Sequence, residues 1–156
     1  DNPANWQGAG ASPGSHQTPA TPYGAWAAAS GLGAGPQAQP FADFELDGIV
    51  NLLEFALGSD PTARDLALLP QAGIRSVEVN GQTAGYLTLT YRKRRNAPSL
   101  SYTVEVSSDL SSWQPTSHQV GPPEDNGDGT DSVTMRDLQP IAAGVRRFIR
   151  LAIAEQ

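Results

Sequence analysis

The sequence predicts a mainly β protein, in which an antiparallel β-sandwich follows a short loop–helix unit and a Gly/Pro-rich N-terminal segment. Three observations support this fold class. Small and polar residues dominate residues 1–40, apolar residues recur at helical spacing within residues 41–70, and a period of two runs through residues 71–156. We therefore predict three parts with these bounds.

Residues 1–40 have the composition of an extended linker, because they carry almost no charge and mostly lack the apolar period that a core requires. The exception is "PYGAWAAASG", in which Pro22 suits a first helical turn and Gly31 suits a helix end. This pattern predicts a short helix over residues 22–30, anchored on a neighbouring element by Tyr23 and Trp26. Trp6 is a second candidate anchor.

The apolar residues after position 48 predict a helix of about nine residues, which is marginal without tertiary contacts. They fall at i, i+3, i+4, i+7 and i+8 and form one stripe: Ile49, Leu52, Leu53, Ala56 and Leu57. Gly58 suits the C-terminal cap, and "SDP" ends the segment. We expect the stripe to pack on the core while Asn51 and Glu54 lie on another face.

About five or six strands are predicted downstream, since apolar and polar residues alternate between turn signals. "IRSVEV" and "YLTLTYR" flank the hairpin signal "NGQTAG", and the later segments are "LSYTVEVSSDL", "DSVTMRDL" and "VRRFIRLAIA". No helical stretch separates them. Short strands at this spacing indicate an antiparallel sandwich, with an up-and-down barrel as the alternative.

Composition excludes several classes of protein. The net charge of −6 argues against a nucleic-acid partner, because phosphates would be repelled. With no Cys, the chain has no disulfide, thiolate metal site or Cys nucleophile. No apolar run approaches the roughly 20 residues that span a bilayer, so no membrane span is predicted. Because the chain begins at Asp1, we expect a processed piece of an exported protein, located outside the cell or on its surface.

The acidic residues before the predicted helix have the spacing of a twelve-residue EF-hand loop. Positions 1, 3, 5, 9 and 12 are Asp43, Glu45, Asp47, Asn51 and Glu54, and Ile49 at position 7 offers a main-chain carbonyl. Gly48 at position 6 permits the positive φ that turns the loop around an ion. Calcium prefers such converging oxygens, so the sequence predicts a Ca²⁺ site. The alternative is a helix cap at Asp47, with Asp43 and Glu45 favouring the helix dipole.

These motifs resemble a C-terminal accessory module of large secreted bacterial proteins. The resemblance rests on "YGAWAAASGL", "FADFELDGIVNLLEFALGSDP", "GYLTLTYRKRRNAPSLSYTVEVSSDLSSWQP" and "RRFIRLAI", and spans roughly Tyr23 to Leu151. The loop is similar to those of dockerin and thrombospondin type 3 repeats. The resemblance implies export and calcium binding more firmly than any activity. Phe44, Glu45 and Leu46 depart from the acidic and glycine residues usual in that family's loop.

Three other features each allow two interpretations. "PEDNGDGTDS" is either a second calcium loop at residues 124–131 or a solvated hairpin turn. The basic run at residues 92–95 is either a patch for an acidic polysaccharide or a charged guard at a strand end. Trp113 and Tyr102 are candidate ligand-binding residues, because aromatic faces stack on sugar rings, although Trp113 also suits a core position.

No nucleophile, zinc or phosphate-loop motif occurs, so an enzyme is not predicted. The sequence instead predicts a non-catalytic, calcium-stabilised structural or interaction module of a bacterial surface, suited to adhesion or to filament formation. Its expected partners are other copies of itself or a larger parent protein. Two alternatives stay open: a carbohydrate-binding accessory domain of a secreted enzyme, and a C-terminal sorting or anchoring domain.

Overall fold

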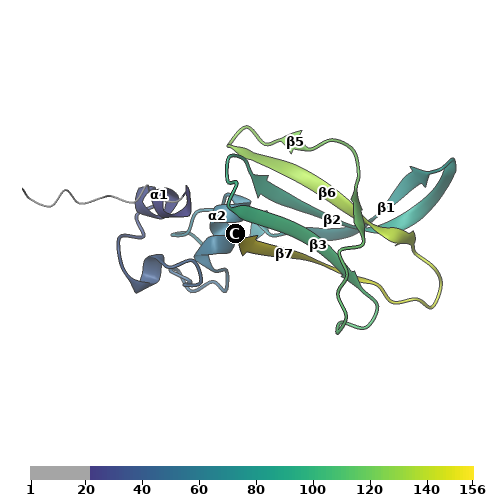
Figure 1. Ribbon diagram of the computed structural model, residues 1–156, viewed down its shortest axis with the longest axis horizontal. Coiled ribbons are helices and arrows are strands. Elements are labelled where there is room, and N and C mark those ends of the chain that lie inside the picture. The colour runs from purple at the N-terminus through teal and green to yellow at the C-terminus, as the bar shows by residue number, and fades with distance from the viewer. Residues whose placement is uncertain (1–21) are drawn as a thin grey trace, which may run out of the picture.

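The computed structural model describes residues 22–156 and confirms a mainly β chain with antiparallel sheets (Figure 1). Residues 1–21, which include Trp6, lie outside the described residues. The helical elements are α1 (Pro22–Ala29), η1 (Pro36–Ala38), α2 (Asn51–Leu57) and η2 (Leu66–Leu68). The strands are β1 (Gln71–Val79), β2 (Gln82–Arg94), β3 (Leu100–Ser107), β4 (Ser117–Gln119), β5 (Glu124–Asp125), β6 (Thr130–Pro140) and β7 (Phe148–Glu155). Within the described range, no helix has the length and apolarity needed to cross a lipid bilayer.

Aromatic side chains join α1 to α2. Phe55 of α2 is 2% exposed and meets Tyr23 edge-on, with ring centroids 5.6 Å apart. The Trp26 ring lies 5.3 Å from the same phenyl ring, and the Tyr23 hydroxyl donates to the carbonyl of Ala38 at 2.9 Å. The helix that the sequence predicts at residues 22–30 therefore packs through the two aromatic residues expected to anchor it. Phe55, the centre of this cluster, does not belong to the predicted apolar stripe.

Helix α2 is shorter than predicted and is buried on nearly every side. It begins at Asn51, and Val50 takes the N-cap position without a side-chain hydrogen bond. Asn51 and Glu54 are 0% and 1% exposed, so both polar residues are buried together with the apolar ones. An apolar stripe alone does not predict this burial. It arises because the preceding loop and η1 cover the polar side of the helix.

Gly58 ends α2 in the left-handed conformation, with φ +80°, and its N–H donates to the carbonyl of Glu54 at 2.8 Å. A Cβ at this position would lie 2.6 Å from the Cγ2 of Thr130 on β6. The chain therefore needs glycine here both for its backbone conformation and for the close approach of helix and sheet.

We expect Gly58→Ala to lower the free energy of unfolding by about 2–4 kcal/mol, because left-handed strain and overpacking add. Gly33→Ala is the matched control, since Gly33 has φ +73° and a Cβ added there would meet no atom within 4 Å. That variant should lose only about 1 kcal/mol. Urea unfolding measures both values, and equal losses would contradict the packing argument.

Within residues 22–156, seven strands form two antiparallel sheets. The larger has the order β1-β2-β6-β4, with β5 also pairing with β6, and the smaller contains β3 and β7. The predicted hairpin joins β1 to β2 through Asn80 (φ 54°) and Gly81 (φ 78°), a pair of positive angles that suits a two-residue turn. The five segments quoted from the sequence correspond to β1, β2, β3, β6 and β7, and the short strands β4 and β5, of three and two residues, lie outside them.

The apolar core has two clusters. One contains residues of both sheets: Leu89, Tyr91 and Val133 from the larger sheet and Val104 from β3. The other joins the helices to the start of β3. Tyr102 packs against both clusters, and its hydroxyl donates to the carbonyl of Ala56 at 2.9 Å. The helical unit is thereby attached to both sheets.

Two of the four basic residues at the end of β2 bind the C-terminal end of α2. Arg92 Nε donates to the carbonyl of Leu57 at 3.0 Å, and Arg94 Nε donates to the carbonyl of Phe55. The Arg94 guanidinium also lies 4.7 Å from the centre of the Phe55 ring. Unpaired carbonyls at a helix end attract cations, so these arginines have a structural role in joining α2 to the sheet.

Candidate metal centre

The loop before α2 is held in shape by two of its own carboxylates. Asp43 accepts from the N–H of Asp47 at 3.2 Å and from the N–H of Gly48 at 2.8 Å. Asp47 accepts from the N–H of Ile49 at 2.8 Å, and Gly48 has the predicted positive φ, +94°. These bonds close the loop upstream of the helix. Asp47 does not cap α2, whose N-cap is Val50.

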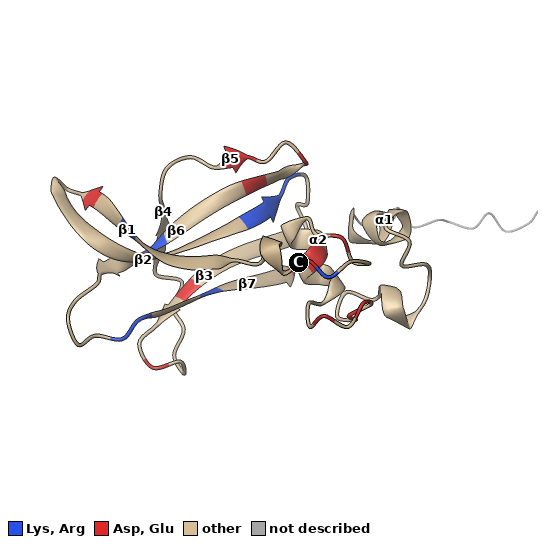
Figure 2. Cartoon of the chain, turned by 180° about the vertical axis from the view of Figure 1, so that it is seen from behind, with Lys and Arg blue, Asp and Glu red and all other residues tan. Residues whose placement is uncertain are grey.

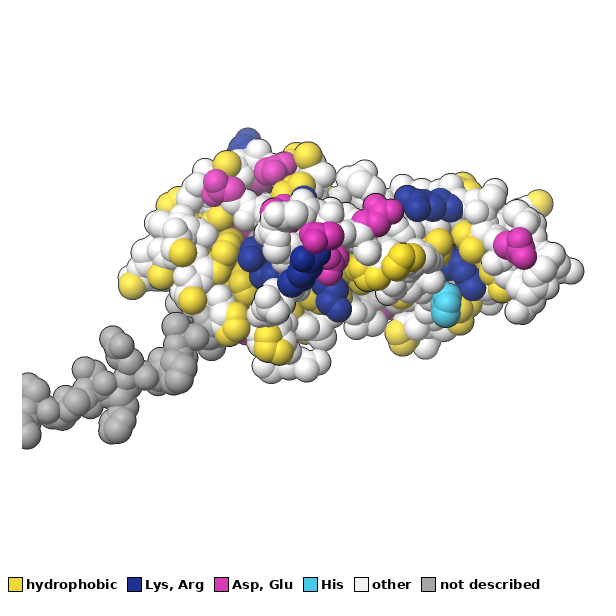
Figure 3. Space-filling model, turned by 90° about the horizontal axis from the view of Figure 1, so that it is seen from above, with side chains coloured by type: hydrophobic (Ala, Val, Ile, Leu, Met, Phe, Trp, Pro, Cys, Tyr) yellow, Lys and Arg dark blue, Asp and Glu magenta, His cyan; other side chains and the backbone are white. Residues whose placement is uncertain are grey.

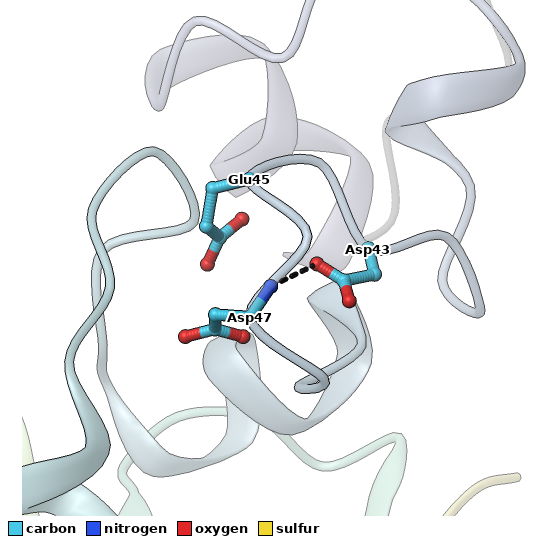
Figure 4. Close-up of side chains that lie close together, drawn as sticks. All are labelled: Asp43, Glu45 and Asp47. Carbon is cyan, nitrogen blue, oxygen red and sulfur yellow. Dashed lines mark hydrogen bonds between the residues drawn. The ribbon is translucent and has the colours of Figure 1, made fainter.

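Three of the predicted ligands come together in this loop. Oxygen atoms of Asp43, Glu45 and Asp47 all lie within 4.8 Å of one another, and Figure 4 shows their side chains grouped around one turn of the chain. Figure 2 shows the same acidic group beside α2, at the helical end of the molecule. Like charges so close repel, and a cation among them would remove the repulsion.

Five oxygen atoms of the predicted ligand residues are buried without a hydrogen-bond partner: Glu45 Oε1, Glu45 Oε2, Asp47 Oδ2, Asn51 Oδ1 and Glu54 Oε2. Among the described residues only one other side-chain atom, the Ser99 hydroxyl, shares this condition. A buried oxygen without a donor or cation costs about 1–3 kcal/mol, and more when it is charged. These oxygens are concentrated in the loop and the first turn of α2, which makes this group the candidate cation site of the described residues.

Asn51 is oriented by its amide nitrogen. Nδ2 donates to the carbonyls of Gln37 and Gln39 at 2.8 and 2.9 Å, and these two acceptors distinguish the nitrogen from the oxygen. Oδ1 is consequently left for another electropositive partner. The sequence predicts Asn51 as a ligand but gives no sign of its second role, which is to hold η1 against the helix.

Burial raises the pKa of Glu54 from its ordinary value of 4.5 to about 8. The neighbouring Glu45 carboxylate adds to the effect, both as an acceptor that would favour a protonated Glu54 and through its charge, followed by the negative charges of Asp47 and Asp43. All of these causes disfavour the ionised carboxylate in the absence of a cation. The metal-free site is therefore electrostatically unsatisfied near neutral pH.

The metal-free protein should lose stability as the pH rises from about 5 to about 8. A raised carboxyl pKa means that the folded state keeps a proton which the unfolded chain has already released above its ordinary pKa. The stabilising contribution is complete below pH 4.5 and disappears as the pH passes through about 8. Urea unfolding of protein freed of metal by a chelating resin, at several pH values, measures this slope. Saturating calcium should flatten or reverse it, and a rising stability without metal would contradict the account of Glu54.

The donor set fits a hard cation. Carboxylate and amide oxygens suit calcium or magnesium, whereas softer metals prefer the nitrogen and sulfur ligands that this loop lacks. Asp43, Glu45, Asp47, Asn51 and Glu54 would bind the ion by their side chains. Ile49 is 6% exposed, as expected of a residue whose side chain faces the core, and the contribution of its carbonyl stays a prediction.

One contact to this loop was not predicted from the sequence. Arg64, from the segment after α2, donates through Nη2 to the carbonyl of Leu46 at 2.8 Å. Leu46 has φ 59°, an uncommon conformation for a bulky residue. Neither the spacing nor the composition signals this bond, because it joins residues 18 apart through a main-chain atom.

Two arginines pair with three of the four carboxylates in the second acidic segment, residues 124–131. Arg95 pairs with Asp131 and with Asp125, the latter at 2.6 Å, and Arg92 pairs with Asp128. A hydrogen bond from Thr130, followed by the Arg92 side chain, lowers the pKa of Asp128 to about 2. Figure 3 shows acidic and basic side chains in contact on this upper face. The geometry favours the turn interpretation, because the carboxylates that would bind a cation already form ion pairs with guanidinium groups.

The two candidate ligand-binding aromatics are engaged within the chain. Trp113 is half-buried, donates from Nε1 to the carbonyl of Leu110 at 3.2 Å, and has the Arg150 guanidinium 4.1 Å from its ring centre. Tyr102 is half-buried and stacks on Tyr91, with ring centroids 6.0 Å apart. Neither ring is an open, isolated platform, and a sugar-binding role for them stays a prediction.

Comparison with protein-family models, with characterised proteins and with solved structures gives no match for this chain. The resemblance to an accessory module therefore stays a prediction, and the function must be inferred from the residues described above.

Proposed function

We propose that this chain is a non-catalytic, calcium-stabilised structural or interaction module that acts outside the cell or on its surface. One observation carries the proposal: five buried oxygens from Glu45, Asp47, Asn51 and Glu54 lack any hydrogen-bond partner. Buried oxygens without a hydrogen-bond partner are rare in proteins, and one calcium ion could coordinate these five together.

Calcium is preferred over magnesium because of the number and nature of the ligands. The loop offers four carboxylates, one amide oxygen and the carbonyl of Ile49, and calcium accepts six to eight oxygens in flexible geometry. Magnesium usually keeps several waters and takes only one or two carboxylates. Calcium sites of extracellular modules are commonly weak, which suits the high calcium level outside cells.

The metal would act structurally. Its ligands come both from the loop and from α2, and Asn51 also binds the main chain around η1, so one ion would join three adjacent segments. We further propose that the two sheets, which share the cluster of Leu89, Tyr91, Val104 and Val133, form the predicted sandwich on which this calcium unit packs. A site that unites elements in this way couples metal binding to folding.

Isothermal titration with calcium tests the proposal. We expect one ion per chain, and at least about tenfold weaker binding for Asp47→Asn, which keeps the shape of the side chain but removes a charge. Glu78→Gln on the exposed β1 strand is the matched control and should bind as the wild type does. Absence of calcium binding, or an equal loss in both variants, would refute the site.

No specific observation favours the alternatives of a carbohydrate-binding domain or a sorting domain. The expected partners, other copies of the chain or a larger parent protein, are part of the proposal. Location outside the cell rests on the resemblance and on calcium availability, and immunolabelling of intact cells would test it.

A further inference from the structure

Apolar side chains cover the outer side of the calcium loop. Phe41 is 80% exposed, Leu46 is 76% exposed and Phe44 is 37% exposed, all within six residues. Phe44 and Leu46 alternate with the ligands Asp43 and Glu45, so the oxygens face inward while the apolar groups face solvent. Figure 3 shows hydrophobic atoms at the surface of the helical end. Exposed apolar residues gathered in this way commonly mark a contact surface.

Leu46 is unfavourable for the stability of the free chain in its backbone conformation as well as in its exposure. Its φ of 59° would suit glycine, and the side chain makes no compensating burial. Neither local conformation nor the core of the described chain explains a leucine here. Contact with another molecule would explain it.

A cavity elsewhere on the chain has apolar and basic lining residues, which complement the exposed apolar residues and the negative charge of the calcium loop. It measures about 850 Å³ and lies where the end of β2, the start of β3 and β6 meet. Tyr91, Leu100 and Val133 supply an apolar lining, and Lys93 and Arg95 supply cations. Such a volume accommodates several side chains of a partner.

Lys93 gives this cavity its unpaired positive charge. It is the single lysine of the sequence, and within the described residues it has no carboxylate partner, whereas Arg95 is paired with Asp125 and Asp131. The four carboxylates of the calcium loop, when ionised, carry more negative charge than the two positive charges of one calcium ion can balance. The loaded loop therefore keeps negative charge that complements the charge of Lys93.

We propose that the calcium loop of one copy docks into this cavity of a second copy, with Phe41 and Leu46 entering beside Lys93. The occupant is another molecule of the same chain, because the loop and the cavity match in apolar character and in charge and are both unfilled by described residues. The two surfaces differ, so the contact is head-to-tail and repeats into open chains or a ring. The inference rests on the proposed function in one respect, since calcium would order the docking loop.

Two variants that each destroy one surface test the contact. Phe41→Ser/Leu46→Gly removes the apolar side chains and places glycine where φ is positive, which should not strain the fold. Lys93→Glu reverses the charge in the cavity. With calcium, we expect the full wild-type chain to assemble, and each variant alone to associate at least about tenfold more weakly. An equimolar mixture should give a dimer, because it restores one intact loop facing one intact cavity.

Sedimentation velocity in calcium measures these masses. A wild-type chain that stays monomeric at about 1 mM, or a mixture of variants that gives no dimer, would overturn the proposed contact. Variants that assemble like the wild type would overturn it as well. Titration calorimetry on the same samples separates the two proposals. Both variants should keep calcium binding, and a wild-type chain that binds calcium but stays monomeric refutes only the docking contact.

Discussion

Calcium should raise the melting temperature of the wild-type chain, and Glu54→Gln should abolish that response while stabilising the metal-free protein. At a calcium concentration of about 100 times Kd, binding contributes about 2.7 kcal/mol, or roughly 5–10 °C for a domain of this size. The variant loses a ligand carboxylate. It also loses the buried ionisable carboxyl group, whose pKa is raised to about 8 first by burial and then by the neighbouring carboxylates, and its amide can donate to Glu45. Thermal unfolding followed by circular dichroism, with calcium and with chelator, measures both effects.

Glu78→Gln provides the comparison, because it removes the same charge from an exposed strand. It should keep the wild-type response to calcium and change metal-free stability by no more than about 0.5 kcal/mol. Identical melting curves of the wild type with calcium and with chelator would contradict the metal site. A metal-free Glu54→Gln protein less stable than the wild type would contradict the account of Glu54 as a buried carboxyl group that is unfavourable without a cation.

Arg147→Ala should be the most destabilising single substitution in the β part, at about 3–5 kcal/mol. Arg147 donates through Nε and Nη2 to both oxygens of Asp137, at 2.6 and 2.7 Å, and the Asp137 side chain is fully buried. Removing the guanidinium would leave a buried carboxylate opposed mainly by the N–H of Gln139. Breaking one side of a buried pair costs more than the pair itself contributes. Urea unfolding gives the loss.

The adjacent residue supplies a matched control. Arg146 carries the same side chain but is exposed, so Arg146→Ala should cost at most about 0.5 kcal/mol. A similar loss in both variants would mean that charge alone, rather than the buried pair, sets the effect. Asp137→Asn should recover part of the loss in the Arg147→Ala background, because it removes the unpaired charge.

Local sequence patterns predicted much of the β part. The Asn80-Gly81 turn needs two positive φ angles, which these residue types accept readily, and the alternation around it places β1 and β2 within a few residues. Strands β4 and β5 escaped prediction because they are short and pair only along the edge of β6. Their existence depends on a neighbouring strand and not on their own residues.

The candidate site was predicted by spacing, since Asp43, Glu45 and Asp47 lie close together as their loop positions require. Spacing could not reveal that α2 begins late and that Glu54 is buried, because both depend on how the preceding loop and η1 pack against the helix. The basic run shows the same limit. Arg92 and Arg94 bind the end of α2, while Lys93 lines the cavity. Alternation along β2 predicts that Lys93 points to the opposite face from the two arginines, but it does not predict what each face contacts.

The sequence by itself determined the β-rich class, the turn between β1 and β2 and the grouping of acidic residues in the candidate site, because these follow from backbone preferences and the short reach of neighbouring residues. Only the tertiary structure decided which oxygens are buried without a partner, which arginines pair with the second acidic segment, and where apolar residues remain exposed. Those outcomes depend on contacts between residues far apart in the chain. Burial and charge pairing are properties of such contacts and are not encoded in any single segment.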